Sequence, residues 1–208
     1  RIDGVGQGAP QSNFVLMTIW DGGGVDTYDL SNYTTSLSID LNPGAWTVLD
    51  TSAAQFQRAN LGTNGSPGAS SYFARGNIAN ALIDPNNLAE TASLIDNAIG
   101  GSGSDTIAGN VIANPLIGNG ANDTIDGRDG VDPVVYSGPR SQYATSEVGG
   151  AVRIADQRPG TPDGIDMVSN VEFFRFTNRT YTRAEVLNQP PVLSPDAGSP
   201  HPLTELPG

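Results

Sequence analysis

Residues 100–135 read GGSGSDTIA, GNVIANPLI, GNGANDTID and GRDGVDPVV, which are four consecutive blocks of nine residues. Every block opens with glycine, its sixth position holds Asp or Asn, and its eighth position holds an aliphatic residue. The sixth positions are Asp105, Asn114, Asp123 and Asp132, and the eighth positions are Ile107, Leu116, Ile125 and Val134. Self-similarity at this fixed period is typical of a parallel β-roll, in which each block makes a glycine-rich turn and a short strand.

Two blocks complete one coil of such a roll, so residues eighteen positions apart stack on each other. Asp105 then stacks with Asp123, and Asn114 stacks with Asp132. Between stacked turns a Ca²⁺ ion can take one side-chain oxygen from each residue together with backbone carbonyl oxygens. Glycine is expected in the turns because they require positive φ and a close approach of the backbone to the ion. The Asp105 site should be the stronger one, because Asn114 is neutral and Ile112 stands where a glycine is wanted.

The sequence therefore predicts calcium ligands among the turn residues of the repeats. They are Gly100, Ser102, Asp105, Asn114, Gly118, Gly120, Asp123, Gly127, Asp129 and Asp132. Without the ion the stacked carboxylates repel each other, so folding of the roll should be coupled to calcium binding. The alternative is that these Gly-Asp segments are ordinary solvated turns, which four blocks in register disfavour.

The composition agrees with a metal-stabilised module. The chain has 208 residues, 26 Gly, 15 Pro, no Cys and a net charge of −12. The lack of cysteine excludes disulfides, so something else must rigidify a glycine-rich backbone. The acidic balance argues against nucleic acid as a partner. We also expect no membrane span, since no run of about 18 apolar residues occurs, and no N-terminal signal.

We expect an all-β chain built around a short parallel β-roll with flanking strands. Alternating apolar residues in SLSIDL at 36–41 predict a half-buried strand before the repeats. Alternating runs between turn signals predict a small antiparallel β unit after them. The expected divisions are an N-terminal segment at 1–13, a domain at 14–135 with roll repeats at 100–135, the β unit at 136–188 and a Pro-rich linker or tail at 189–208.

Two further stretches, TIWDGGGVDTYDLSNY at 18–33 and LIDNAIGGSGSDTIAGN at 94–110, resemble the C-terminal domain of serralysin-type metalloproteases, members of the repeat-in-toxin group. The resemblance covers roughly residues 14–135. It implies calcium ligation by Asp21, Gly23, Gly24 and Asp26, with Asp96 standing where the family has Glu.

The resemblance also implies export by a type I secretion machinery, with the chain unfolded in the cytosol and folding outside the cell. Extracellular modules can use weak calcium sites of roughly 10⁻⁴ to 10⁻³ M. Two features depart from the family. The segment at 50–90 is longer than in serralysins, and only four repeats are present, several of them imperfect.

The loop DGID at 163–166 has two interpretations. A plain turn is favoured for Asp163 to Asp166, and a further ion site is the alternative.

The sequence offers little for catalysis. The zinc motif H-E-x-x-H is absent, and the one histidine, His201, lies in the Pro-rich tail. A glycosidase-like carboxylate pair is disfavoured because the repeat spacing already explains the Asp residues as ligands. Self-cleavage at Asp132–Pro133 or Asp84–Pro85 is a further, less favoured alternative.

Two function classes remain for a secreted, non-catalytic chain. In the first, it is the calcium-dependent folding and export module of a larger enzyme, whose upstream domain is a metalloprotease. In the second, it is a structural spacer of a surface adhesin. The expected partners are calcium ions, an upstream catalytic or adhesive domain of the same polypeptide, and the type I secretion machinery.

Overall fold

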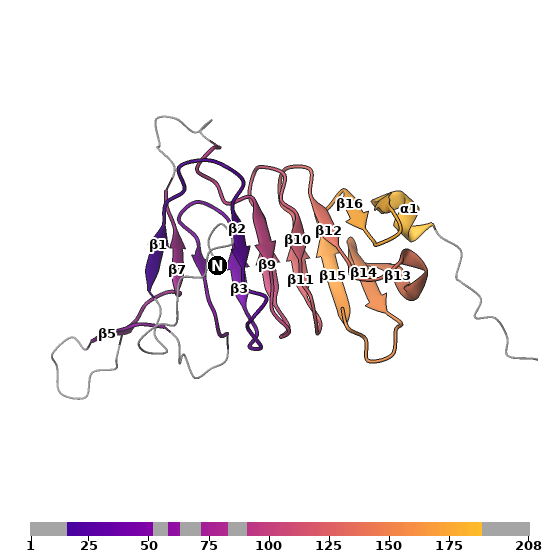
Figure 1. Ribbon diagram of the computed structural model, residues 1–208, viewed down its shortest axis with the longest axis horizontal. Coiled ribbons are helices and arrows are strands. Elements are labelled where there is room, and N and C mark those ends of the chain that lie inside the picture. The colour runs from indigo at the N-terminus through magenta and orange to yellow at the C-terminus, as the bar shows by residue number, and fades with distance from the viewer. Residues whose placement is uncertain (1–15, 52–57, 63–71, 83–90, 189–208) are drawn as a thin grey trace, which may run out of the picture.

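The computed structural model describes residues 16–51, 58–62, 72–82 and 91–188, and these residues form an almost entirely β structure. Figure 1 shows an elongated stack of short strands that runs from the N-terminal part to a C-terminal cap. The N-terminal segment at 1–13 and the Pro-rich tail at 189–208, with His201, lie outside the described residues. No helix among the described residues has the length and apolar character needed to cross a membrane.

Two six-stranded sheets form the roll and continue into its cap. The first contains, in spatial order, β17 (Thr180–Thr182), β16 (Phe173–Arg175), β12 (Pro133–Val135), β10 (Leu116–Ile117), β8 (Asn97–Ile99) and β2 (Thr27–Asp29). The second contains β13 (Tyr143–Val148), β14 (Ala151–Asp156), β15 (Ile165–Ser169), β11 (Thr124–Asp126), β9 (Thr106–Ala108) and β3 (Ser38–Asp40).

The strand register shows that two blocks make one coil. Thr124 pairs with Thr106 in parallel strands β11 and β9. In the opposite sheet Leu116 pairs with Ala98 on one side and with Val134 on the other. Each of these offsets is eighteen residues, so the predicted parallel β-roll is confirmed.

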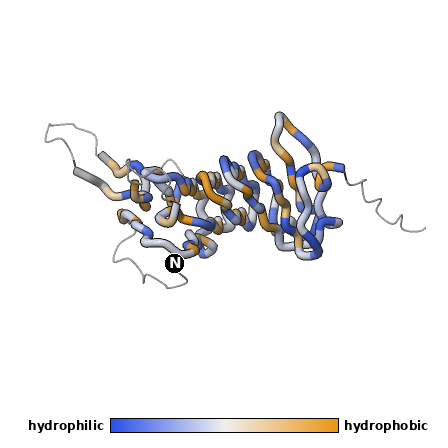
Figure 2. The backbone as a smooth tube through the Cα atoms, turned by 90° about the horizontal axis from the view of Figure 1, so that it is seen from above, coloured by the Kyte–Doolittle hydropathy of each residue, from blue (hydrophilic) through white to orange (hydrophobic). Residues whose placement is uncertain are grey.

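The eighth-position residues form the apolar interior between the two sheets. Ile107, Leu116, Ile125 and Val134 are all 0% exposed. Burial of one such side chain contributes about 1.5–3 kcal/mol, so this column is the main apolar stabilisation of the coils. Figure 2 shows hydrophobic and hydrophilic residues alternating along each coil of the tube.

The predicted strand before the repeats is also present. Leu37, Ile39 and Leu41 are each 1% exposed, and β3 lies beside β9 with Ile39 paired to Ile107. The apolar side of residues 36–41 therefore faces the same interior as the eighth-position residues of the repeats.

The predicted antiparallel strands after the repeats are stacked directly on the roll. Strand β15 pairs in parallel with β11, and β16 pairs in parallel with β12, so both sheets run on without a break at residue 135. Antiparallel pairing begins only further on, between β14 and β15, between β13 and β14, and between β16 and β17. The short helix α1 (Arg183–Leu187) follows, with a capping box between Thr182 and Glu185.

A smaller set of strands lies at the other end of the stack. Strands β1 (Met17–Ile19), β7 (Ile78–Asn80) and β4 (Trp46–Thr47) form a three-stranded sheet. Strands β5 (Asn60–Gly62) and β6 (Tyr72–Phe73) form a separate antiparallel pair. The Tyr28 hydroxyl of β2 donates a hydrogen bond of 2.7 Å to Asn80 Oδ1 of β7, which ties this sheet to the first coil.

Three non-glycine turn residues of the repeats have a positive φ, namely Asn119, Ala121 and Arg128. Ala121, at the fourth position of its block, has φ 68°. The glycine at the same position of the next block, Gly130, has φ 118°. Side chains other than glycine rarely adopt this left-handed region, because Cβ approaches the backbone too closely.

We predict that Ala121→Gly raises the free energy of unfolding by about 0.5–1 kcal/mol, because it relieves the left-handed strain at a modest entropic cost. Urea denaturation in calcium measures the change. The matched control is Ala144→Gly in the middle of β13, which should lower the free energy of unfolding by about 0.5–1 kcal/mol. Equal destabilisation by both variants would contradict the strain at Ala121.

Candidate metal centre

A ladder of carboxylates runs along the turns that precede the strands of the second sheet. Asp166 Oδ1 accepts a hydrogen bond of 2.9 Å from the backbone nitrogen of Asp123. Asp123 Oδ1 accepts one of 2.8 Å from the backbone nitrogen of Asp105, and Asp105 Oδ1 accepts one of 2.8 Å from that of Leu37. Each carboxylate therefore binds the backbone of the stacked turn in the neighbouring coil.

A second ladder runs along the turns that precede the strands of the first sheet. Glu172 Oε2 accepts from the backbone nitrogen of Asp132 at 2.9 Å, and Asp132 Oδ1 accepts from that of Asn114 at 2.7 Å. Asn114 Nδ2 donates to the carbonyl oxygen of Asp96 at 2.8 Å. The structure thus brings together both predicted pairs, Asp105 with Asp123 and Asn114 with Asp132.

The ladder carboxylates are buried, and the described residues provide no ion-pair partner for them. Asp105, Asp123 and Asp132 are 2%, 1% and 0% exposed. None of the ion pairs between described residues involves them. Burial raises the pKa of all three carboxyls, to about 7 for Asp123 and about 6 for Asp132, while backbone hydrogen bonds partly oppose this effect. Neighbouring carboxylates raise the pKa of Asp123 and Asp132 further. The ionised coils are therefore electrostatically unfavourable without a cation.

Two of these side chains also hold a buried oxygen that makes no hydrogen bond. They are Asp123 and Asp132, whose Oδ2 atoms have no partner among the described residues. In the other two blocks the corresponding atom is used, because Asp105 Oδ2 accepts from Gly101 N at 2.7 Å and Asn114 Oδ1 accepts from Asn110 N at 2.6 Å. A buried oxygen without a donor is what a bound cation would satisfy.

The block-opening glycines make room for these carboxylates. A Cβ atom on Gly100, Gly118 or Gly127 would stand 2.5, 2.0 or 2.6 Å from the carboxylate oxygen of its own block. None of the three has a positive φ, although Gly130 does. The expected close approach is therefore observed at the opening positions, and the expected left-handed conformation is wrong for them.

The remaining predicted ligands of the repeats lie on the outer parts of the turns. Ser102 and Asp129 are exposed, and Gly120 is half-buried. The side chains of Ser102 and Asp129 take no part in the two ladders. Backbone atoms of these turns join neighbouring coils, as in the 2.9 Å hydrogen bond from Ser102 N to Tyr33 O.

The N-terminal candidate ligands form a loop beside the second ladder. Asp21 Oδ1 accepts from Gly23 N at 3.0 Å, and Asp21 Oδ2 is buried with no partner among the described residues. Gly23 and Gly24 have φ 108° and 135°, a region that favours glycine. Asp96 Oδ2 accepts from Asp26 N at 2.8 Å, so these two predicted residues are in direct contact.

The donor set limits the kind of metal that fits. Among the described residues no group of three or more His, Cys, Asp or Glu side chains is arranged to hold an ion. A cation would have to combine one or two carboxylates with backbone carbonyl oxygens. All-oxygen coordination of this kind suits Ca²⁺, which takes six to eight oxygen ligands in flexible geometry. The unpartnered Oδ2 atoms of Asp123 and Asp132 agree with such an ion.

Sequence reasoning missed the residues that end the two ladders. Asp166 was considered only as part of a turn or a separate ion loop, and Glu172 was not singled out. Forty residues separate Asp132 from Glu172 in the chain, so the nine-residue period gives no signal for this contact. For Asp166 the one available signal in the sequence is its position after an Asp-containing turn, at the start of a strand.

We predict that, in chelator, the free energy of unfolding falls as the pH rises from about 4 to about 7. The folded-state pKa values of Asp123 and Asp132 are raised to about 7 and about 6, so the folded protein binds their protons more tightly than the unfolded chain does. This stability is fully present below about pH 4 and is lost as the pH passes through the folded values. Far-UV circular dichroism of the protein in chelator, followed across this pH range, measures the folded fraction that reports this change. A free energy of unfolding in chelator that rises over the same pH range would contradict the raised pKa values of these buried carboxyls.

We predict that Gly118→Ala lowers stability in calcium by about 1–3 kcal/mol, because its Cβ would collide with Asp123 Oδ2. The control is Gly22→Ala, where a Cβ meets nothing within 4 Å. Thermal unfolding in saturating calcium compares the two. If Gly118→Ala is as stable as Gly22→Ala, the Asp123 carboxylate does not need the space that a Cβ at position 118 would fill, and the prediction is wrong.

Comparison with known proteins supports the resemblance drawn from the sequence. Residues 7–51 match the family described as "Peptidase M10 serralysin C terminal". The chain is also 32% identical over 105 residues to Metalloprotease AprA of Pseudomonas entomophila (strain L48). That alignment covers 50% of this chain and 15% of the relative, so the matched part is a small share of the relative's length. The resemblance to a serralysin C-terminal domain is confirmed.

Proposed function

We propose that this chain, which resembles the C-terminal domain of serralysin-type metalloproteases, is a calcium-dependent folding module of a larger secreted protein. The observation that carries the proposal is the stacking of buried carboxylates along the coils. Asp105 contacts Asp123, Asp132 contacts Asn114, and Asp123 and Asp132 each keep a buried oxygen without a hydrogen-bond donor.

The physical basis is a balance between burial and charge. Without a cation, each coil must bury an ionised carboxylate close to another acid, which opposes folding. A bound Ca²⁺ ion replaces this repulsion by attraction and uses the carbonyl oxygens of the turns as further ligands. Because the site exists only when the coils are stacked, the free energy of calcium binding becomes free energy of folding.

This coupling suits a protein that crosses from the cytosol to the outside of the cell. Where calcium is scarce the roll stays unfolded, and sites of roughly 10⁻⁴ to 10⁻³ M fill only at extracellular concentrations. We propose export by a type I machinery on this basis, with the roll folding after release.

The comparison supports a proposal for the role within the parent protein. The matched relative is named a metalloprotease, which favours an upstream protease domain over an adhesin. We propose that the present chain is itself non-catalytic and stabilises that domain after export. The ladder acids then serve as metal ligands.

We predict that Asp123→Asn separates the hydrogen-bonding role of the Asp123 carboxylate from the role of its negative charge. The amide still accepts the hydrogen bond from Asp105 N, but the negative charge is gone. In chelator the variant should therefore be at least as stable as the wild type. Its calcium midpoint should shift upward by about tenfold or more, the effect of losing about 1.4 kcal/mol of interaction. Far-UV circular dichroism during calcium titration of chelator-treated protein measures both, with Mg²⁺ in place of Ca²⁺ as the ion control.

The matched variant is Glu147→Gln, which removes the same charge from the exposed outer part of β13, where Glu147 pairs with Arg183. It should leave the calcium midpoint unchanged. A wild-type chain that is fully folded in chelator and indifferent to calcium would overturn the proposal.

A further inference from the structure

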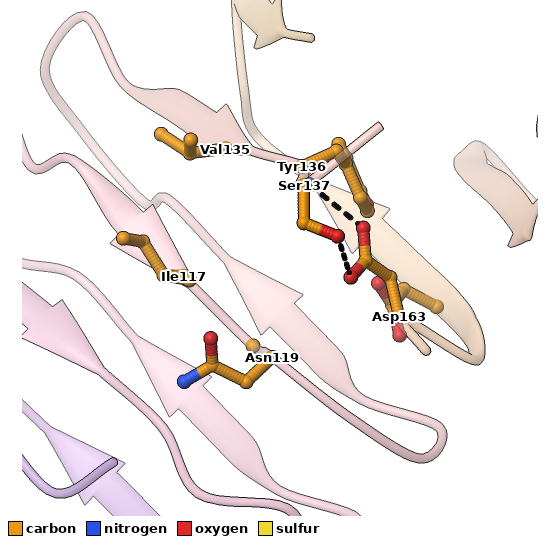
Figure 3. Close-up of a pocket in the computed structure, with 8 residues that line it drawn as sticks. Ile117, Asn119, Val135, Tyr136, Ser137 and Asp163 are labelled. Atoms are coloured by element: carbon orange, nitrogen blue, oxygen red, sulfur yellow. Dashed lines mark hydrogen bonds between the residues drawn. The ribbon is translucent and has the colours of Figure 1, made fainter. Parts of the chain in front are cut away.

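The segment that follows the last repeat block packs against the loop between β14 and β15, which lies outside the repeats. Residues 135–137 lie one coil beyond residues 117–119, and both segments line a pocket of about 220 Å³. Asp163, from the loop between β14 and β15, and Asp166, near the start of β15, complete the lining. Figure 3 shows this pocket, with Ser137 bonded to Asp163 beside Tyr136.

The chain leaves the repeat pattern at this point. Tyr136 stands nine residues after Gly127, where a fifth block would open with glycine. The sixth position of such a block is Ser141, which lies exposed in the 3₁₀ turn Arg140–Gln142. The carboxylate that a fifth block would place next to Asp123 is therefore missing from its expected position in the sequence.

Asp166 takes that place in space. Thr124 of β11 pairs with Met167 of β15, so Asp166 stacks on Asp123 as Asp123 stacks on Asp105. Asp166 Oδ1 accepts from Asp123 N in the same way that Asp123 Oδ1 accepts from Asp105 N. The turn that covers the end of the roll is thus assembled from two separate segments of the chain.

The second acid of the loop is already satisfied. Asp163 accepts hydrogen bonds from Ser137 N at 2.8 Å and from Ser137 Oγ at 2.6 Å. The Arg158 guanidinium lies 3.0 Å from Asp163 Oδ2 and balances its charge. Asp163 therefore fixes the loop against the roll and leaves Asp166 as the acid without a cationic partner among the described ion pairs.

Two buried polar atoms beside Asp166 have no hydrogen-bond partner among the described residues. They are Asp123 Oδ2 and the hydroxyl oxygen of Tyr136. Asp123 is 1% exposed, Asp166 is 2% exposed, and Tyr136, which lines the pocket, is 5% exposed. Two carboxylates without a cationic partner among the described ion pairs, one of them with a buried oxygen that has no hydrogen-bond donor, indicate a missing cationic ligand.

We propose that a further divalent cation of calcium type binds at the edge of this pocket, beside Gly118, held by the carboxylates of Asp123 and Asp166 together with backbone carbonyl oxygens and water. The proposal rests on the proposed function, since Asp123 is shared with the ladder of the repeats. The Tyr136 hydroxyl is a positioning group for Asp166 or for water on the ion. This cation ties the roll to the β14–β15 loop, so that docking of the C-terminal cap depends on calcium.

The test is the number of calcium ions bound by the full chain, measured by native mass spectrometry at increasing calcium concentration. Asp166→Asn keeps the acceptor for Asp123 N and removes the charge, so it should bind one ion fewer than the wild type. Glu147→Gln, with the same change of charge on the exposed surface, should bind as many ions as the wild type. Far-UV circular dichroism in saturating calcium checks that Asp166→Asn is folded as well as the wild type.

Asp166→Glu is the second variant, since it keeps the charge and should retain the ion. If both Asp166 variants lose one ion equally, Asp166 acts only in packing and the proposal is overturned. An unchanged ion count in Asp166→Asn also overturns it and leaves a water-filled pocket, while the calcium sites of the repeats stand. A wild-type chain that binds no calcium at all removes the proposed function together with this inference.

Discussion

The structure depends on one contact that recurs along the roll, a buried carboxylate that accepts a hydrogen bond from the backbone of the neighbouring coil. Asp123 makes it to Asp105, and Asp132 makes it to Asn114. This contact requires the eighteen-residue coil, because only stacked turns bring donor and acceptor together. It also requires glycine at the start of each block, because a Cβ there would occupy the place of the carboxylate. The charge that remains buried opposes the stacking of the coils unless a cation compensates it.

The apolar interior cannot offset that charge on its own. Each coil buries one aliphatic residue per strand, such as Ile125 and Val134, and otherwise consists of turns. Ordering a glycine-rich turn loses much backbone entropy, and the chain has no disulfide to reduce that loss. The cap differs, since it packs aromatic residues such as Phe174 and Phe176 and balances Asp156 with Arg158. Stability is therefore distributed unevenly, because the cap packs a larger apolar core and balances its charge, while the coils bury charge without a cationic partner among the described ion pairs.

The repeats were predictable because their constraints are local and periodic. The stacking of Asp105 on Asp123 and the burial of Ile107 both follow from the nine-residue blocks. The ends of the ladders were not predictable, because Asp166 and Glu172 reach the roll through a long excursion of the chain that no period marks. The conformation of the opening glycines was also misjudged. Glycine is required at these positions because a carboxylate oxygen comes close to Cα. A sequence pattern cannot distinguish this requirement from a requirement for positive φ.

The helix α1 affects whether copies of this module can associate through the edges of their sheets. Stacked parallel coils expose unpaired backbone groups at their outermost strands, which are templates for edge-to-edge polymerisation. At the C-terminal end α1 lies against the outermost strand β13, where Arg140 and Thr145 both donate to the carbonyl oxygen of Val186. At the opposite end the bridge between Ser38 and Val48 occupies the edge of β3. The second sheet therefore has a covered strand at both of its ends, which disfavours edge-to-edge growth into fibres.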